Sequence, residues 1–285
     1  MSETTTPALR EVRGPGALGG GRQRFFDLLW LMSVTEFKRV YFGTILGYLW
    51  SLIRPLMLFG VLYFVFTEGL KVGNSDEVEH YAVLLLMGIV LFTFFSESTN
   101  QAVNSVITHE GVVRKTQFPR LVIPLSTVLT CAFNLALNFL VVLAFVFAFG
   151  VDPTWTWLLL PVAFFFLIAL TVAVSAALSV LYVRFRDAAI IWAVLVQVLF
   201  YATPILYPIT FFENPTTEQL LMTNPLAVIF EQVRVWVLAE PAAPTAAEAA
   251  GGWLHLLPAA AIFAGICLYA AWIFSREAPR IAEDL

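Results

Sequence analysis

The chain has 285 residues, of which 60% are hydrophobic and 13% are charged, with a mean hydropathy of +0.83 and a net charge of −4. Soluble domains carry about 25% charged residues, so this composition excludes an ordinary soluble protein and indicates an integral membrane protein. The two cysteines lie in apolar stretches and the three histidines are scattered, which predicts neither a disulfide framework nor a metal site.

The chain changes character near residue 24. Residues 1–23 are polar and rich in glycine, and they predict a flexible cytoplasmic tail. Residues 24–285 are expected to form a single transmembrane domain. Its first segment, 24–38, intersperses apolar and charged side chains, which is typical of an amphipathic helix that lies in the membrane surface.

Six apolar runs follow, each long enough to cross a hydrocarbon core of about 30 Å as a helix. Backbone groups in lipid must bond within their own segment, which favours helices. The runs cover 46–68, 81–103, 121–149, 156–182, 188–208 and 254–274. Residues 228–238 are apolar but too short to cross, and they predict a short external helix, re-entrant or interfacial, between spans five and six. The predicted fold class is an all-α integral membrane protein with six transmembrane helices.

Lysine and arginine are unevenly distributed across these spans. Six crossings put both termini on one side, and that side holds 13 of the 16 basic residues. Lys71 and Arg234 fall on the other side, and Arg54 lies inside the first span. Cytoplasmic loops carry an excess of basic residues, so both termini are expected to be cytoplasmic.

The chemistry of an enzyme is missing from the sequence. No phosphate loop of the form G-x-x-x-x-G-K-[ST] occurs, and no G-x-S-x-G, H-E-x-x-H or C-x-x-C motif. Glu97 is the one acidic residue clearly inside a span, whereas proton-coupled carriers usually hold more ionisable groups at membrane depth. We therefore expect a transport subunit with no catalytic residue and no metal, energised by another protein.

Four stretches resemble the permeases of type 2 ABC exporters, in the polysaccharide and polyol-phosphate class. They are "LMSVTEFKRVYFGTILGYLWSLIRPL" at 31–56, "VVRKTQFPRLVIPLS" at 112–126, "VRFRD" with "QVLFYATPILYP" at 183–208, and "NPLAVIFEQVR" at 224–234. Their order and spacing agree with the family over nearly the whole chain. Thr35 and Val40 depart from it, since basic residues are common at those positions.

The resemblance implies a homodimer around a central pore, joined to two copies of a separate ATPase that binds ATP and Mg²⁺. The permease itself would bind no cofactor and no nucleic acid. Its substrate would be a lipid-linked polysaccharide, O-antigen-like, galactan or teichoic-acid-like, exported across the bacterial cytoplasmic membrane for cell wall biogenesis. Three alternatives stay open: a drug or small-lipid exporter of the same fold, a secondary carrier driven by an ion gradient, and a membrane scaffold.

The resemblance also implies contacts with the ATPase through the first helix, the link at 104–118 and the turn at 184–187. The alternative for the link and the turn is ordinary anchoring of basic residues at the cytoplasmic face. The expected coupling residues are Glu36, Lys38, Glu110, Arg114, Lys115, Phe118, Arg120, Arg184, Arg186 and Asp187.

The first and fifth spans commonly face the pore in this family. Phe59, Tyr63 and Phe66 share one face of the first span, and Gln197, Tyr201 and Pro204 share one face of the fifth. Aromatic faces could stack on sugar rings, although such stripes usually face lipid or neighbouring helices. Arg54 could instead snorkel or contact a lipid phosphate, and two Pro residues should kink or end the fifth span. The expected pathway residues are Arg54, Phe59, Tyr63, Phe66, Gln197, Tyr201 and Tyr207.

Overall fold

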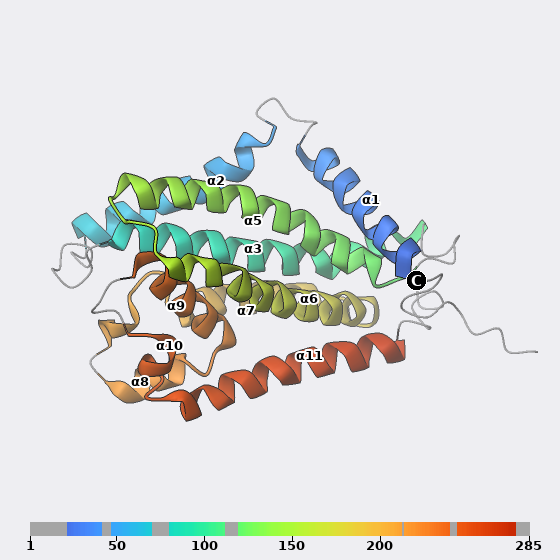
Figure 1. Cartoon of the computed structure of the whole chain (residues 1–285). Helices are drawn as coiled ribbons and strands as arrows, with labels where there is room; N and C mark the ends of the chain where they lie inside the picture. Colours follow the sequence, from blue (N-terminus) through green and yellow to red (C-terminus); the bar gives the residue numbers. More distant parts are fainter. Residues whose placement is uncertain are drawn as a thin grey trace, which may run out of the picture.

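The computed structural model describes residues 22–41, 47–69, 80–111, 119–212, 214–239 and 244–277, and in these ranges every regular element is a helix (Figure 1). The first helix, α1 (Arg22–Tyr41), contains the predicted surface helix and the last two residues of the predicted tail. The rest of that tail, 1–21, lies outside the described residues.

Five helices in the described ranges are long and apolar enough to cross a membrane, and each matches a predicted span. Two of them begin with a short 3-10 turn, and one ends in a π-helical turn. They are α2 (Leu49–Phe64) with η1 (Val65–Gly69), α3 (Tyr81–Thr108), α5 (Val122–Ala148), η3 (Trp155–Leu159) with α6 (Leu160–Arg184), and η5 (Trp253–Leu256) with α11 (Leu257–Glu277).

The helix over the remaining predicted span, 188–208, is shorter than expected. It is α7 (Ala188–Ala202), whose 15 residues extend about 22 Å, less than a hydrocarbon core of about 30 Å. Thr203, with φ −106° and ψ 137°, is extended as a residue before proline usually is. The prediction that Pro204 and Pro208 kink or end this helix is therefore confirmed, whereas the prediction of a helix up to residue 208 is wrong.

The segment after α7 is buried although it is not helical. The Tyr81 hydroxyl donates a hydrogen bond of 2.8 Å to the Leu206 carbonyl, and the Asn224 amide donates one of 3.0 Å to the Thr203 hydroxyl. Non-helical backbone at membrane depth is tolerated where protein surrounds it. Burial of residues 203–206 in this protein meets that condition.

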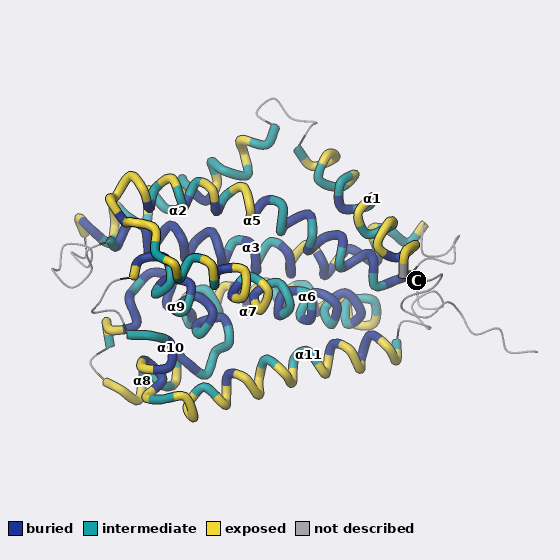
Figure 2. Tube along the Cα trace, viewed as in Figure 1, coloured by how far each residue is buried: buried dark blue, intermediate teal, exposed yellow. Residues whose placement is uncertain are grey.

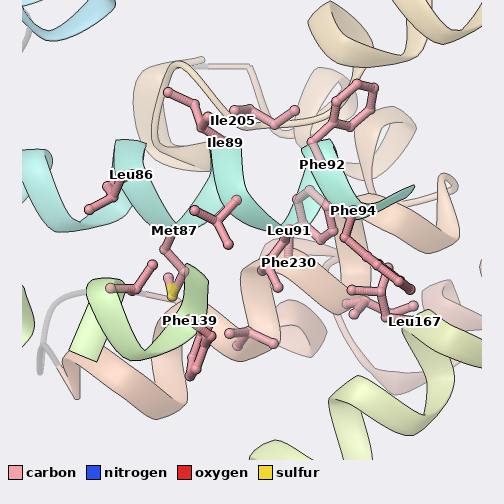
Figure 3. Packing of buried hydrophobic residues seen from close by; sticks show 14 of the residues in the cluster. Leu86, Met87, Ile89, Leu91, Phe92, Phe94, Phe139, Leu167, Ile205 and Phe230 are labelled. Carbon is pink, nitrogen blue, oxygen red and sulfur yellow. The ribbon is translucent and has the colours of Figure 1, made fainter. Parts of the chain in front are cut away.

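The core is built around α3, whose residues 81–92 are all buried. A helix that is apolar all round is stable only when other helices enclose it, and α2, α5, α6, α7 and the helix α9 (Pro225–Leu238) pack on it. Figure 3 shows side chains of α3 and of neighbouring segments meeting in this core. Those labelled are Leu86, Met87, Ile89, Leu91, Phe92 and Phe94 of α3, with Phe139, Leu167, Ile205 and Phe230.

Two smaller clusters lie at opposite ends of the bundle (Figure 1). The terminal cluster joins the start of α1 and α5 to the ends of α3, α6 and α11; its buried members are Phe25, Val106, Val122, Ile123, Ala176, Val180, Ile273 and Phe274. The distal cluster joins η4 (Ile209–Phe211), α8 (Pro215–Leu221), α9 and α10 (Ala246–Ala249) through Ile209, Met222, Ala227, Ala249 and Ala250. α9 confirms a short helix between spans five and six.

Three of the outer helices expose many apolar side chains (Figure 2). Examples are Met57, Val61 and Phe64 on α2, Ile190, Val194 and Val198 on α7, and Leu268 and Trp272 on α11. Soluble monomers rarely expose such contiguous apolar surface. These faces are therefore suited to lipid or to another membrane subunit.

Candidate functional site

Arg54 and Glu97 form an ion pair between two spans. Arg54 on α2 donates from Nη1 to Oε1 of Glu97 on α3 at 3.1 Å, across 43 residues of sequence. Beside Glu97 lies a cavity of about 20 Å³, large enough for one water molecule, with Ser51, Asn134 and Asn138 in its wall. Ionisable groups at membrane depth usually pair with one another, so this pair fastens α2 to the core helix.

Asn134 connects α5 to the end of α1, where its amide donates a hydrogen bond to the Tyr41 hydroxyl. Asn138 bonds within α5, donating to the Asn134 carbonyl at 2.9 Å. Asn134 therefore links two helices, whereas the bond of Asn138 stays within α5. Burial raises the pKa of the Tyr41 hydroxyl to about 12, so this phenol stays protonated at physiological pH and keeps a proton to donate.

The three aromatic residues predicted on the first span share one helix face, which packs on the same chain. The Tyr63 and Tyr81 rings stack with their centroids 6.4 Å apart, and the Phe59 ring meets Phe145 of α5 edge-on at 5.8 Å. Phe66 packs against the same core. Their role in the pathway stays a prediction, but the open face of α2 is another one, formed by apolar residues such as Met57.

The predicted residues on α7 lie on the opposite side from its core contacts. Trp192 and Phe200 point to α3, where Phe200 meets Phe92 at 5.2 Å between ring centroids. Gln197 is exposed, and Tyr201 keeps 59% of its surface accessible. The Tyr207 hydroxyl donates to the Tyr201 carbonyl at 2.9 Å, which ties the segment after α7 to the end of the helix.

The predicted coupling residues fall into three structural situations. Glu36 pairs with Arg39 on α1 and Lys38 is exposed, while Glu110 is half-buried just beyond the end of α3. Arg120 is 4% exposed and so lies inside the chain. Arg114, Lys115 and Phe118 lie outside the described residues.

The turn between α6 and α7 presents its charges to the surface. The Arg184 guanidinium lies 5.8 Å from the centroid of the Phe185 ring, and that of Arg186 lies 5.4 Å from the Tyr182 ring. Asp187 is exposed and precedes the first residue of α7. All three charged residues of the predicted contact are thus accessible at one end of the bundle.

A second ion pair, which sequence reasoning missed, lies within α9. Glu231 and Arg234 approach to 3.5 Å with side chains 1% and 8% exposed. The sequence analysis placed Arg234 on the outer face, but the structure buries it in the bundle. Two opposite charges three residues apart in an otherwise apolar 14-residue helix are the signal that could have revealed the pair.

Comparison with known proteins identifies the family of this chain. A model described as "ABC-2 type transporter" matches residues 27–238. The chain belongs to this family. Relatives of this ABC-2 permease include the O-antigen export system permease protein RfbA of Klebsiella pneumoniae, 32% identical over 183 residues that cover 64% of this chain and 69% of that protein. The protein of the same name from Myxococcus xanthus is 28% identical over 204 residues, covering 71% and 77% of the two chains.

Family membership confirms the resemblance inferred from the four sequence stretches. The ABC-2 permease is a multi-pass transport subunit of the bacterial inner membrane. The matched region runs from α1 to the end of α9 and contains every predicted coupling and pathway residue. It also contains the Arg54–Glu97 and Glu231–Arg234 pairs, neither of which the sequence analysis identified.

Proposed function

We propose that this ABC-2 permease is the membrane half of an ATP-driven exporter of a lipid-linked polysaccharide of the O-antigen kind. The observation that supports it most is the 28–32% identity to permeases named for O-antigen export. The 285-residue sequence holds no phosphate loop, so ATP and Mg²⁺ bind to a separate ATPase in this proposal. Two permease chains and two ATPase chains make up the proposed exporter.

The proposal includes six crossings with both termini in the cytoplasm. α7 and the buried segment 203–208 together make the crossing that α7 is too short to make alone. Arginines near the terminal cluster include Arg24, Arg184, Arg186 and Arg276, whereas Glu218 and Glu248 lie on the distal helices. An excess of basic residues marks the cytoplasmic side, which supports a cytoplasmic terminal end and an external distal end.

The proposed pathway runs between two copies of the permease, along the open faces of α2 and α7. Both helices pack on α3 through one face and leave the other unpartnered in the single chain. Tyr201 and Gln197 lie on the open side of α7. An exposed aromatic ring can stack on a sugar and release it, because such contacts are individually weak.

Purification of the tagged permease from its native membranes tests the exporter. We expect a stoichiometric partner that carries a phosphate loop, and ATP-dependent movement of a lipid-linked glycan when the complex is reconstituted in vesicles. A permease free of any ATPase in several mild detergents would contradict the ATP-driven mechanism. A complex that moves only small amphiphiles would contradict the polysaccharide substrate.

Replacing Tyr201 with alanine is expected to lower export while the complex still assembles. Loss of one stacking contact of about 0.5–1.5 kcal/mol corresponds to a fall of roughly two- to tenfold in rate. Tyr201→Phe keeps the ring and should keep export. Phe165→Ala removes an exposed ring from α6, outside the proposed pathway, and serves as the matched control. Equal export by Tyr201→Ala and Phe165→Ala would refute the role of Tyr201.

A further inference from the structure

A cavity of about 260 Å³ lies between the ends of α6 and α11. One wall comes from α6 with Leu181 and Val183, and the other comes from α11 with Tyr269 and Ile273. Its volume is far above the roughly 10–15 Å³ that a single water molecule needs. We call it the terminal cavity, because both spans end beside it near the terminal cluster.

The terminal cavity combines two cations with aromatic side chains. Arg184 and Arg276 both line it. The Arg276 guanidinium lies 5.3 Å from the centroid of the Trp272 ring, which holds the charge beside the apolar wall. Glu277 approaches Arg276 at Nε, with 3.7 Å between this nitrogen and Oε1. A guanidinium has five N–H donors, so this contact leaves Arg276 able to bind an anion.

The described residues that line the terminal cavity carry a net positive charge. Among them, two arginines outweigh one carboxylate, Glu277. The ends of α6 and α11 contribute partial negative charge, about half an elementary charge each, and this effect is screened at exposed sites. The arginine side chains, and no helix terminus, therefore supply the attraction for an anion.

The apolar walls decide which kind of anion fits. A free anion gains no binding free energy from the apolar side chains of Leu181, Val183 and Ile273. A lipid does, because its first methylene groups can pack against them. Exposed Trp and Tyr residues are typical of the membrane–water boundary, where headgroups lie. Basic pockets between spans on the cytoplasmic side bind anionic headgroups. We propose that the terminal cavity binds the headgroup of an anionic phospholipid through Arg184 and Arg276.

The position of the cavity separates it from the proposed pathway. It lies between α6 and α11, which pack together, whereas α2 packs on α3 and α5. A bulk phospholipid can reach this perimeter directly from the bilayer, while the exported glycan lipid follows the open faces of α2 and α7. The assignment of the cavity to the cytoplasmic leaflet rests on the orientation under the proposed function. The choice of an anionic phospholipid as ligand does not depend on that orientation.

Native mass spectrometry of the full-length permease tests the site and scores lipid retention instead of export. The permease is first incubated with one ligand at a time: phosphatidylglycerol, phosphatidylcholine with the same acyl chains, or inorganic phosphate. Each lipid is then tested again in competition with inorganic phosphate. We expect preferential retention of phosphatidylglycerol, lowered about tenfold in the double variant Arg184→Gln/Arg276→Gln, because charge-assisted hydrogen bonds are lost. The double variant Arg184→Lys/Arg276→Lys keeps the charges and should keep most of the binding.

Arg186→Gln is the control, since this substitution removes one positive charge two residues from Arg184, and Arg186 does not line the cavity. It should retain phosphatidylglycerol as the parent chain does. Equal retention of the two lipids would overturn the proposal, as would unchanged binding in the double Gln variant or lost binding in the Lys variant. Displacement of the lipid by inorganic phosphate would identify a free anion as the ligand and overturn it too.

Discussion

Glu231→Ala is expected to destabilise the permease by about 3–5 kcal/mol, because it leaves Arg234 buried without its charged partner. Both side chains are almost inaccessible, at 1% and 8% exposure. Removing one partner of a buried pair costs more than the pair contributes, since the remaining charge loses hydration without compensation. Thermal or denaturant unfolding of the purified permease in one fixed detergent measures the loss.

Two variants separate this effect from a general loss of polar contacts. Glu231→Leu/Arg234→Leu removes both charges and should be much less destabilising than Glu231→Ala, because no charge stays buried. Glu36→Ala breaks the more exposed Glu36–Arg39 pair and should cost at most about 1 kcal/mol. Similar unfolding of Glu231→Ala and Glu36→Ala would show that the α9 pair is not energetically significant.

Gly88→Leu is expected to destabilise the permease by about 1–3 kcal/mol through overpacking. A Cβ at Gly88 on α3 would lie 3.1 Å from Ile205 Cγ2 and 3.3 Å from Ile205 Cα. Ile205 belongs to the buried non-helical segment that ends α7, so a larger side chain would displace that segment. Thermal unfolding measures the stability, and reactivity of a cysteine introduced at Tyr201 measures the displacement of α7.

Gly265→Leu is the matched control on another span, because a Cβ at Gly265 meets nothing within 4 Å. Leu forms helices better than Gly, so this change should not destabilise. The double variant Gly88→Ala/Ile205→Ala should lose less unfolding free energy than the sum of the two single variants. Ile205→Ala removes the Cγ2 atom that the new Cβ would meet. Strictly additive effects, or a harmless Gly88→Leu, would show that the contact is not limiting.

The sequence predicted the membrane class and five of the spans because those properties follow from local composition. A run of about 20 apolar residues has few alternatives to a helix in lipid, and the termini of α5 and α6 lie within a few residues of the predicted limits. The sequence also predicted approximately where α7 ends, since Pro204 disfavours a helical conformation at Thr203. The buried, non-helical path of residues 203–206 could not be predicted, because hydrogen bonds from the distant residues Tyr81 and Asn224 hold it.

The candidate site also has features that the sequence predicts and features that depend on tertiary packing. The family could be identified from local patterns such as Tyr41 to Trp50 and Phe118 to Arg120, while the pathway and coupling residues proposed from the same patterns stay predictions. The sequence could not predict which side of α2 stays open, since an aromatic stripe and an apolar stripe on one helix are equally acceptable to lipid. Packing on α3 and α5 decided it, turning Phe59 and Tyr63 inward.

By itself the sequence determined that this protein is a helical, multi-pass ABC-2 permease without a phosphate loop, because hydropathy and short motifs are properties of contiguous residues. Only the tertiary structure decided which charges are paired and which surfaces are open. Arg54 pairs with Glu97 across 43 residues, and Arg184 and Arg276 line one cavity from two helices far apart in the sequence. Such arrangements depend on how the helices pack. Periodicity carries no information on that packing, so these pairs became visible only in the folded chain.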